Sequence, residues 1–101
     1  MKTVAIAGTF DSKGKEFLFL KELFEEIGLK TLTLHTGTFN PAFTPDVSNN
    51  EIAAEAGENL SEIVAMKDRA RATAAMSRGV EKITPRLYKE GKFDGIISLG
   101  G

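Results

Sequence analysis

A short stretch near the N-terminus, residues 8–16 (GTFDSKGKE), combines the residue types of a phosphate-binding loop. It has two glycines, two hydroxyl groups, two carboxylates and two lysines. Hydroxyls and lysines can donate to phosphate oxygens, and the Asp11 carboxylate can accept from a ligand hydroxyl or hold a metal-bound water. The candidate ligand-binding residues of this loop are Gly8, Thr9, Asp11, Ser12, Lys13 and Gly14.

The spacing of this loop differs from that of two common nucleotide-binding motifs. A P-loop has four residues between its glycines and a hydroxyl residue after its lysine. Here Gly8 and Gly14 enclose five residues, and Glu16 stands where a hydroxyl would bind magnesium. The G-x-G-x-x-G pattern is absent as well. The remaining argument is general, because a loop between a strand and a helix offers free amides and the positive end of the helix dipole to an anion.

Residues elsewhere in the chain could serve the same site. Arg69 could bind a phosphate or carboxylate through two parallel hydrogen bonds, and Gly100 and Gly101 begin a second glycine-rich turn. His35, the only histidine, could act as an acid or base, or it could simply bind carbonyl groups at the end of a strand. With no cysteine and no second histidine, we expect no transition-metal site.

Each of these candidates also has an ordinary structural interpretation. Asp11 or Ser12 could do no more than cap the helix that follows, while the lysines of the loop remain solvated. Asp68 is well placed to cap a helix, with Arg69 exposed in its first turn. The residue types alone leave both interpretations open.

Hydrophobic periodicity predicts three strands and several helices. Short apolar or alternating runs predict strands at residues 3–7, 30–35 and 93–99. Apolar residues three and four apart predict a helix over residues 13–27, with Phe17, Leu20, Phe24 and Ile27 facing the core. Two short helices are expected near residues 49–56 and 60–66, the first starting at a capping box of Ser48 and Glu51. A long helix over residues 69–89 should be kinked or interrupted at Pro85.

Strands that alternate with helices predict parallel pairing through right-handed crossovers. The expected fold is α/β, a three-layer, Rossmann-like parallel sheet of which about three strands lie in this chain. If the first strand lies between the other two, the loops after the first and third strands meet at one edge of the sheet. Because the chain stops where a glycine-rich turn would begin, we expect residues 1–101 to be the N-terminal part of a nucleotide-binding-like subdomain in a longer protein.

Composition narrows the class of protein further. The chain has 101 residues, of which 42% are hydrophobic and 27% charged, as in an ordinary globular domain. A net charge of -1 gives no electrostatic reason to expect nucleic acid as a partner. No apolar run reaches the roughly 20 residues of a membrane span, and the N-terminus is too short in apolar residues for a signal peptide. We therefore expect a cytoplasmic protein that contacts neither membrane nor nucleic acid.

Four motifs occur in a characteristic order: GTFDSKGKE, AGENL, DRARATAAMSRG and DGIISLGG. Together they resemble the N-terminal part of the ATP-binding-domain family related to the tomato mosaic virus resistance protein. The resemblance implies two α/β subdomains in a much longer chain, and binding of ATP with or without magnesium. By position, the resemblance carries the family's motifs over to the following residues: Gly8, Thr9, Asp11, Ser12, Lys13, Gly14 and Glu16 in the first, Asp68, Arg69, Met76 and Gly79 in the helix, and Gly100 and Gly101 in the last. Ala70 replaces the glycine of the family pattern, and His35 occupies a place where the family has an acidic residue.

The first functional hypothesis is therefore a domain that binds ATP, another nucleotide or a small phosphate-containing ligand, in a homo-oligomer. One alternative is an enzyme that acts on a small organic acid or sugar derivative in an interdomain cleft, using Asp11, Lys13, Glu16 and Arg69. The other is a dimeric protein-interaction module, with the alanine-rich helix as its contact surface, including the small-residue patch of Ala72, Ala74, Ala75 and Met76.

Overall fold

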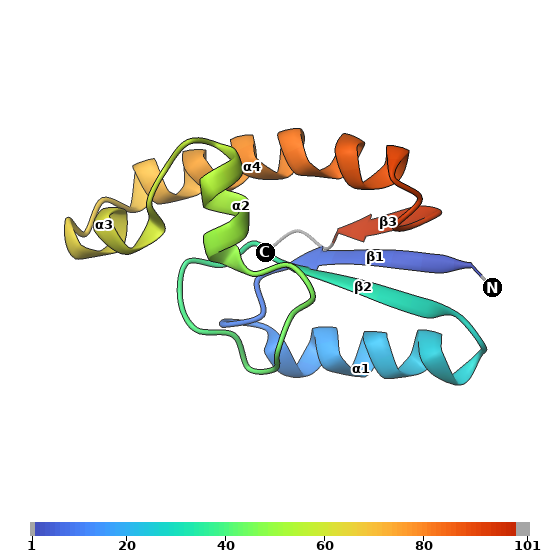
Figure 1. Ribbon diagram of the computed structural model, residues 1–101. Helices are drawn as coiled ribbons and strands as arrows, with labels where there is room; N and C mark the ends of the chain where they lie inside the picture. The colour runs from blue at the N-terminus through green and yellow to red at the C-terminus, as the bar shows by residue number, and fades with distance from the viewer. Residues whose placement is uncertain (1, 99–101) are drawn as a thin grey trace.

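A computed structural model describes residues 2–98 of the chain. Three parallel strands form one sheet in the order β2-β1-β3, with α1 on one face and the other helices on the opposite face (Figure 1). This confirms the expected three-layer α/β, Rossmann-like arrangement. The elements are β1 (Thr3–Gly8), α1 (Gly14–Glu26), β2 (Lys30–His35), α2 (Asn49–Glu55), α3 (Leu60–Ala65), α4 (Arg69–Lys89) and β3 (Gly95–Ser98).

The central strand β1 separates two hydrophobic clusters. Side chains alternate between the faces of a strand, so Ala5 and Ala7 face the α2–α4 layer, whereas Ile6 faces α1. On the α1 side, Ile6 packs with the buried rings of Phe10 and Phe17. The other side holds the larger cluster, to which β2 and the helices α2, α3 and α4 all contribute. Because β1 is buried on both faces, its sequence reads as a continuous apolar run.

Helix α1 starts differently from the sequence-based expectation. Its N-cap residue is Lys13, and no side chain within residues 2–98 caps its first turn. The expectation that Asp11 or Ser12 caps this helix is therefore wrong, because the Asp11 carboxylate is turned toward other amides. The predicted inner stripe also ends early, since Ile27 is 68% exposed.

The other helix ends follow their sequence signals. Ser48 and Glu51 form the predicted capping box of α2, and the Asp68 side chain accepts a hydrogen bond from the Arg71 amide at the start of α4. Helix α4 continues through Pro85 as one element, so the expected interruption does not occur. In the preceding turn the Thr84 hydroxyl donates to the Val80 carbonyl at 2.7 Å.

Gly79 explains how α4 lies so close to α2. A methyl group at this position would overlap the carbonyl oxygen of Ile52, which belongs to the backbone of α2 and cannot simply rotate away. The close approach of the two helices fixes the long α4 over the sheet. No helix in the described part of the chain is both long and apolar enough to cross a membrane.

Candidate functional site

A cleft of about 1190 Å³ opens at the carboxyl ends of the three strands. In such sheets this rim is the usual place for ligands, and here the central strand lies between the other two as the site hypothesis requires. Three segments supply most of the walls: the β1–α1 loop, the segment after β2, and the first half of α4 with the turn before it. Its polar lining residues are Thr9, Asp11, Ser12, Thr36, Thr38, Lys67, Asp68, Arg69, Thr73, Ser77, Glu81 and Ser98.

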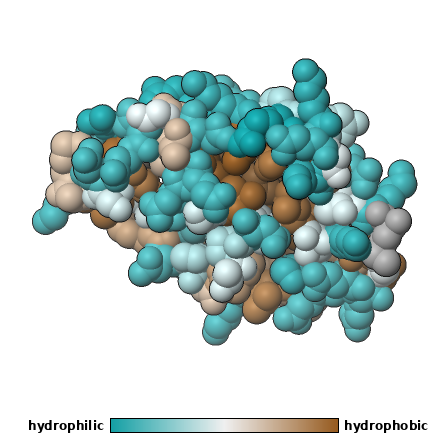
Figure 2. All heavy atoms as spheres, in the orientation of Figure 1, coloured by the Kyte–Doolittle hydropathy of each residue, from teal (hydrophilic) through white to brown (hydrophobic). Residues whose placement is uncertain are grey.

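One wall of the cleft is apolar. Ala72, Met76 and Val80 recur every fourth residue along α4, and Ala7 contributes from the end of β1. On the face that Figure 2 draws, hydrophobic residues also lie between α4 and the sheet and are surrounded by hydrophilic side chains. A mostly apolar concavity with a few converging polar groups is typical of small-molecule sites.

Asp11 joins two of the loops that border the cleft. One of its carboxylate oxygens accepts from the Ser12 amide at 2.9 Å, and the other accepts from the Phe39 amide at 3.0 Å. The Ser12 hydroxyl donates to the Thr9 hydroxyl at 3.0 Å. The structure thus brings Thr9, Asp11 and Ser12 together at the cleft, with the Asp11 carboxylate already engaged by backbone donors.

Gly8, Lys13 and Gly14 do not line the cleft. Both glycines permit close packing, because a methyl group on Gly8 would overlap the Phe17 ring and one on Gly14 would overlap the Ala42 side chain. Lys13 donates its amide to the Thr9 carbonyl at 2.9 Å. The expected glycine contacts after the third strand, Gly100 and Gly101, lie outside the described residues.

Across the cleft, the start of α4 presents two cations. Lys67 and Arg69 both line the cleft, and neither has an acidic partner among residues 2–98. The other arginines of the helix differ, since Arg71 and Arg78 pair with Glu58 and Arg86 pairs with acidic neighbours. Arg69, a candidate phosphate-binding residue from the sequence, thus lines the same cleft as Thr9 and Ser12.

Lys67 has an unusual backbone. Its φ is 55°, in the left-handed region that favours glycine. At the ends of the other helices the chain places glycine in this conformation, at Gly28, Gly57 and Gly91. A lysine in this conformation costs about 1 kcal/mol relative to glycine. Lys67 is therefore the exception among these helix ends, and its side chain lines the cleft.

His35 is a structural residue in this arrangement. It is fully buried and stacks on Phe10, and its Nδ1 accepts from the amides of Phe10 and Gly37 at 3.2 and 3.3 Å. The proton is therefore assigned to Nε2, which donates to the Phe39 carbonyl at 2.7 Å. With both ring nitrogens engaged by backbone groups, His35 holds the segment after β2 in place and does not face the cleft.

Asn49 also holds the segment after β2, in addition to His35. The buried Asn49, in the first turn of α2, donates to the carbonyls of Gly37 and Phe39 at 3.0 and 3.2 Å. These bonds set the backbone of Phe39 but leave the residue 59% exposed at the cleft. An aromatic ring beside hydroxyls and cations gives the cleft a surface on which a flat ligand group can stack.

The described residues contain no group of three or more histidine, cysteine, aspartate or glutamate side chains that could hold a metal ion. The carboxylates of the cleft, Asp11, Asp68 and Glu81, therefore do not form a metal cage. Asp11 could still reach a hydrated magnesium ion carried in by phosphate groups, which needs few protein ligands.

Several cleft residues were missed by sequence reasoning. Thr73 and Ser77 follow Arg69 at intervals of four, so all three lie along one side of α4. That spacing was a usable signal, but the apolar side of this helix, with Ala72 and Met76, was interpreted as packing on the sheet or as a subunit contact, and no ligand site was expected there. Lys67 had no signal, because a left-handed lysine is not recognisable from residue type.

Residues 2–101 match the model of the family described as "Uncharacterised protein family (UPF0261) N-terminal domain". A UPF0261 protein of Clostridium tetani is 39% identical over 101 residues, covering 99% of this chain and 25% of that protein. A UPF0261 protein of Brucella suis is 30% identical over 99 residues, covering 97% of this chain and 24% of the relative. The chain thus spans about a quarter of the length of these relatives. No solved structure matches it.

These matches correct the family assignment made from the sequence motifs. The resemblance to the ATP-binding-domain family of the tomato mosaic virus resistance protein is wrong, because the family model and the relatives all point to UPF0261 instead. The four motifs are therefore features of a different family, and the ATP binding inferred through that resemblance loses this support. The chain belongs to the UPF0261 family, and residues 2–101 match its N-terminal domain.

Proposed function

We propose that the cleft binds a small phosphate-bearing ligand and that a nucleotide such as ATP is the best candidate. The observation that supports this most is the placement of Lys67 and Arg69, two cations without acidic partners among residues 2–98, across from the hydroxyls of Thr9 and Ser12. Phosphate oxygens accept from both kinds of donor.

The remaining lining suits the rest of such a ligand. The apolar residues of α4 and the exposed ring of Phe39 offer van der Waals and stacking contacts to a base, while Thr36, Thr73 and Ser77 offer hydrogen bonds to sugar hydroxyls. The volume of about 1190 Å³ is sufficient for a nucleotide.

Magnesium would offset the negative charge of the cleft. Asp11, Asp68 and Glu81 oppose a bare polyphosphate, whereas a hydrated magnesium ion between the phosphates and Asp11 would turn one of these charges into an attraction. We therefore expect tighter binding of the nucleotide with magnesium than without it.

A thermal-shift titration with inorganic phosphate, ADP and ATP, each with and without magnesium, tests the proposal. At ten times its dissociation constant a ligand stabilises the folded state by about 1.4 kcal/mol, which for a domain of this size raises Tm by roughly 5–10 °C. Arg69→Gln should weaken binding roughly tenfold to a hundredfold, because it removes a charged hydrogen-bond donor.

The matched control is Arg78→Gln. Arg78 lies on the same helix and carries the same charge, but it is paired with Glu58 and does not line the cleft. Equal losses in the two variants would indicate non-specific attraction. The absence of any shift with all three compounds at millimolar concentration would contradict the proposal.

A further inference from the structure

Helix α1 carries an apolar stripe that the structure leaves uncovered. Phe19, Leu23 and Ile27 are spaced by four residues and are 69%, 43% and 68% exposed. They continue around the helix from Leu20 and Phe24, which are only partly buried against the sheet. We refer to Phe19, Leu23 and Ile27 as the α1 stripe. Three large apolar side chains side by side on one helix are more than scattered surface residues.

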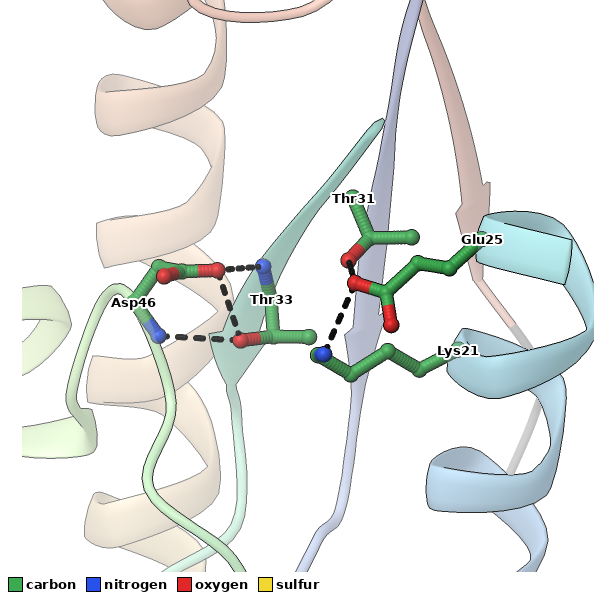
Figure 3. Close-up of polar contacts among 5 residues, drawn as sticks. All are labelled: Lys21, Glu25, Thr31, Thr33 and Asp46. Carbon is green, nitrogen blue, oxygen red and sulfur yellow. Dashed lines mark hydrogen bonds and ion pairs between the residues drawn. The ribbon is translucent and has the colours of Figure 1, made fainter. Parts of the chain in front are cut away.

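The opposite flank of α1 is polar and faces β2. Glu25 accepts from Lys21 at 2.8 Å and from the Thr31 hydroxyl of β2 at 2.9 Å (Figure 3). These bonds, that with Lys21 first, hold the pKa of the Glu25 carboxyl below its usual value. Because this flank lies over β2, the α1 stripe lies on the side of α1 away from β2.

The β2 edge of the sheet is also closed by the loop that follows it. Asp46 accepts from the amide and the hydroxyl of Thr33 at 2.8 and 3.0 Å, as Figure 3 shows. The next residue, Val47, forms a parallel bridge with Leu34. Polar cover of this kind is how native proteins protect an edge strand.

The β3 edge has no such cover in the described part of the chain, where β3 pairs with β1 alone. Its register aligns Ile96 with Ala5 and Ile97 with Ile6. Ile96 is thus on the α4 face, where it is 46% exposed, and Ile97 is on the α1 face. Since α1 packs over β1 and β2, the α1 side of β3 lies open on the side of α1 that bears the stripe.

We propose that the β3 edge and the α1 stripe form one docking surface for the polypeptide that follows this domain in full-length UPF0261 proteins. That polypeptide adds a parallel strand beside β3 and a helix over the α1 stripe. The argument for this occupant is length, because the relatives of Clostridium tetani and Brucella suis are about four times as long as the part matched here.

Crossover handedness refines the proposal. The connection from β2 to β3 runs across the sheet with α4 on one face, whereas the connection from β1 to β2 runs the other way with α1 on the opposite face. A strand added beyond β3 continues in the direction of the second connection, so its right-handed crossover places a helix on the α4 face, near Ile96. The helix that covers the α1 stripe is therefore a different one from the helix of this crossover.

The experiment compares the 101-residue chain with the full-length protein, in which this domain is followed by the polypeptide proposed to dock on it. Hydrogen exchange of the β3 amides should be at least tenfold slower in the full-length polypeptide, because a neighbouring strand protects them. The double variant Phe19→Lys, Ile27→Lys should change the Tm of the short chain by less than about 3 °C, since both side chains are exposed. In the full-length polypeptide the same variant should lower Tm by roughly 5 °C or more.

Met66→Lys is the matched control, because Met66 is 56% exposed but lies outside the docking surface. It should leave the Tm of both proteins nearly unchanged. Two outcomes would overturn the proposal. One is equal exchange of the β3 amides in the short and full-length proteins, which requires no variant to fold. The other is sedimentation of the short chain as a dimer that the double variant returns to a monomer, which would make a second copy the occupant.

Discussion

At the scale of single residues, a few side chains hold the loops around the cleft by hydrogen bonds to backbone amides and carbonyls. Asp11, His35 and Asn49 all engage the segment from Gly37 to Phe39, and together they fix one border of the cleft. Asp11 is the member of this group that also borders the cleft itself. It therefore links the stability of the domain to the shape of the site.

Asp11→Ala should lower the free energy of unfolding by about 1–2 kcal/mol, because it removes two charge-assisted bonds from a partly exposed carboxylate. Asp11→Asn, which keeps one acceptor oxygen, should cost about half as much. Urea denaturation measures both, with the exposed Glu22→Ala as the control, expected within about 0.5 kcal/mol of the parent. A cost for Asp11→Ala no larger than that of the control would show that the bond to Phe39 does not hold the loop.

The residues of the site were only partly predictable. Thr9, Ser12 and Arg69 were singled out by type and position, and the structure places all three at the cleft. Lys13 and Gly14 were singled out by the same reasoning but lie away from it, because residue type does not show which side of a loop faces the ligand edge. Lys67 was invisible for the opposite reason, since its position depends on a left-handed backbone that lysine rarely adopts.

At the scale of elements, local signals predicted most boundaries. The capping box at Ser48 and the cap at Asp68 are interactions between near neighbours, so the sequence contains all that is needed to foresee them. The start of α1 was predicted to within a residue, but its cap was not, because the Asp11 carboxylate accepts from the amide of Phe39, which is 28 residues away. Pro85 was expected to kink or interrupt α4, but the helix runs through it as one element, with Ile83 and Leu87 on either side packed in the core.

The contact between α2 and α4 gives a sharp test at this scale. Gly79→Ala should destabilise the domain by about 1–3 kcal/mol, because the added methyl group meets the backbone of Ile52, and this outweighs the gain of about 1 kcal/mol that alanine normally brings to a helix. Gly95→Ala is the matched control, since within the described structure nothing lies within 4 Å of a methyl group there. A Gly79→Ala variant as stable as the parent in urea would show that the two helices are not in close contact.

At the scale of the whole molecule, the two edges of the sheet differ, and the cleft lies at the carboxyl ends of its strands. Among residues 2–98, the β2 edge is closed by Asp46 and Val47 and the β3 edge is open. An added strand beside β3 would extend the same rim and bring further residues to the site. Ligand binding by this domain and docking of the following polypeptide are separate proposals, because the first depends on Arg69 and the second on the α1 stripe.

The most direct test of the ligand proposal is an NMR titration of this chain with ATP and magnesium, followed through its backbone amide signals. The account predicts that the signals that move belong to three segments bordering the cleft, residues 9–12, 36–39 and 67–73, and that Arg69→Gln abolishes most of the change while Arg78→Gln does not. Signals that stay still at millimolar ATP, or that move chiefly along the paired arginines of α4, would contradict it.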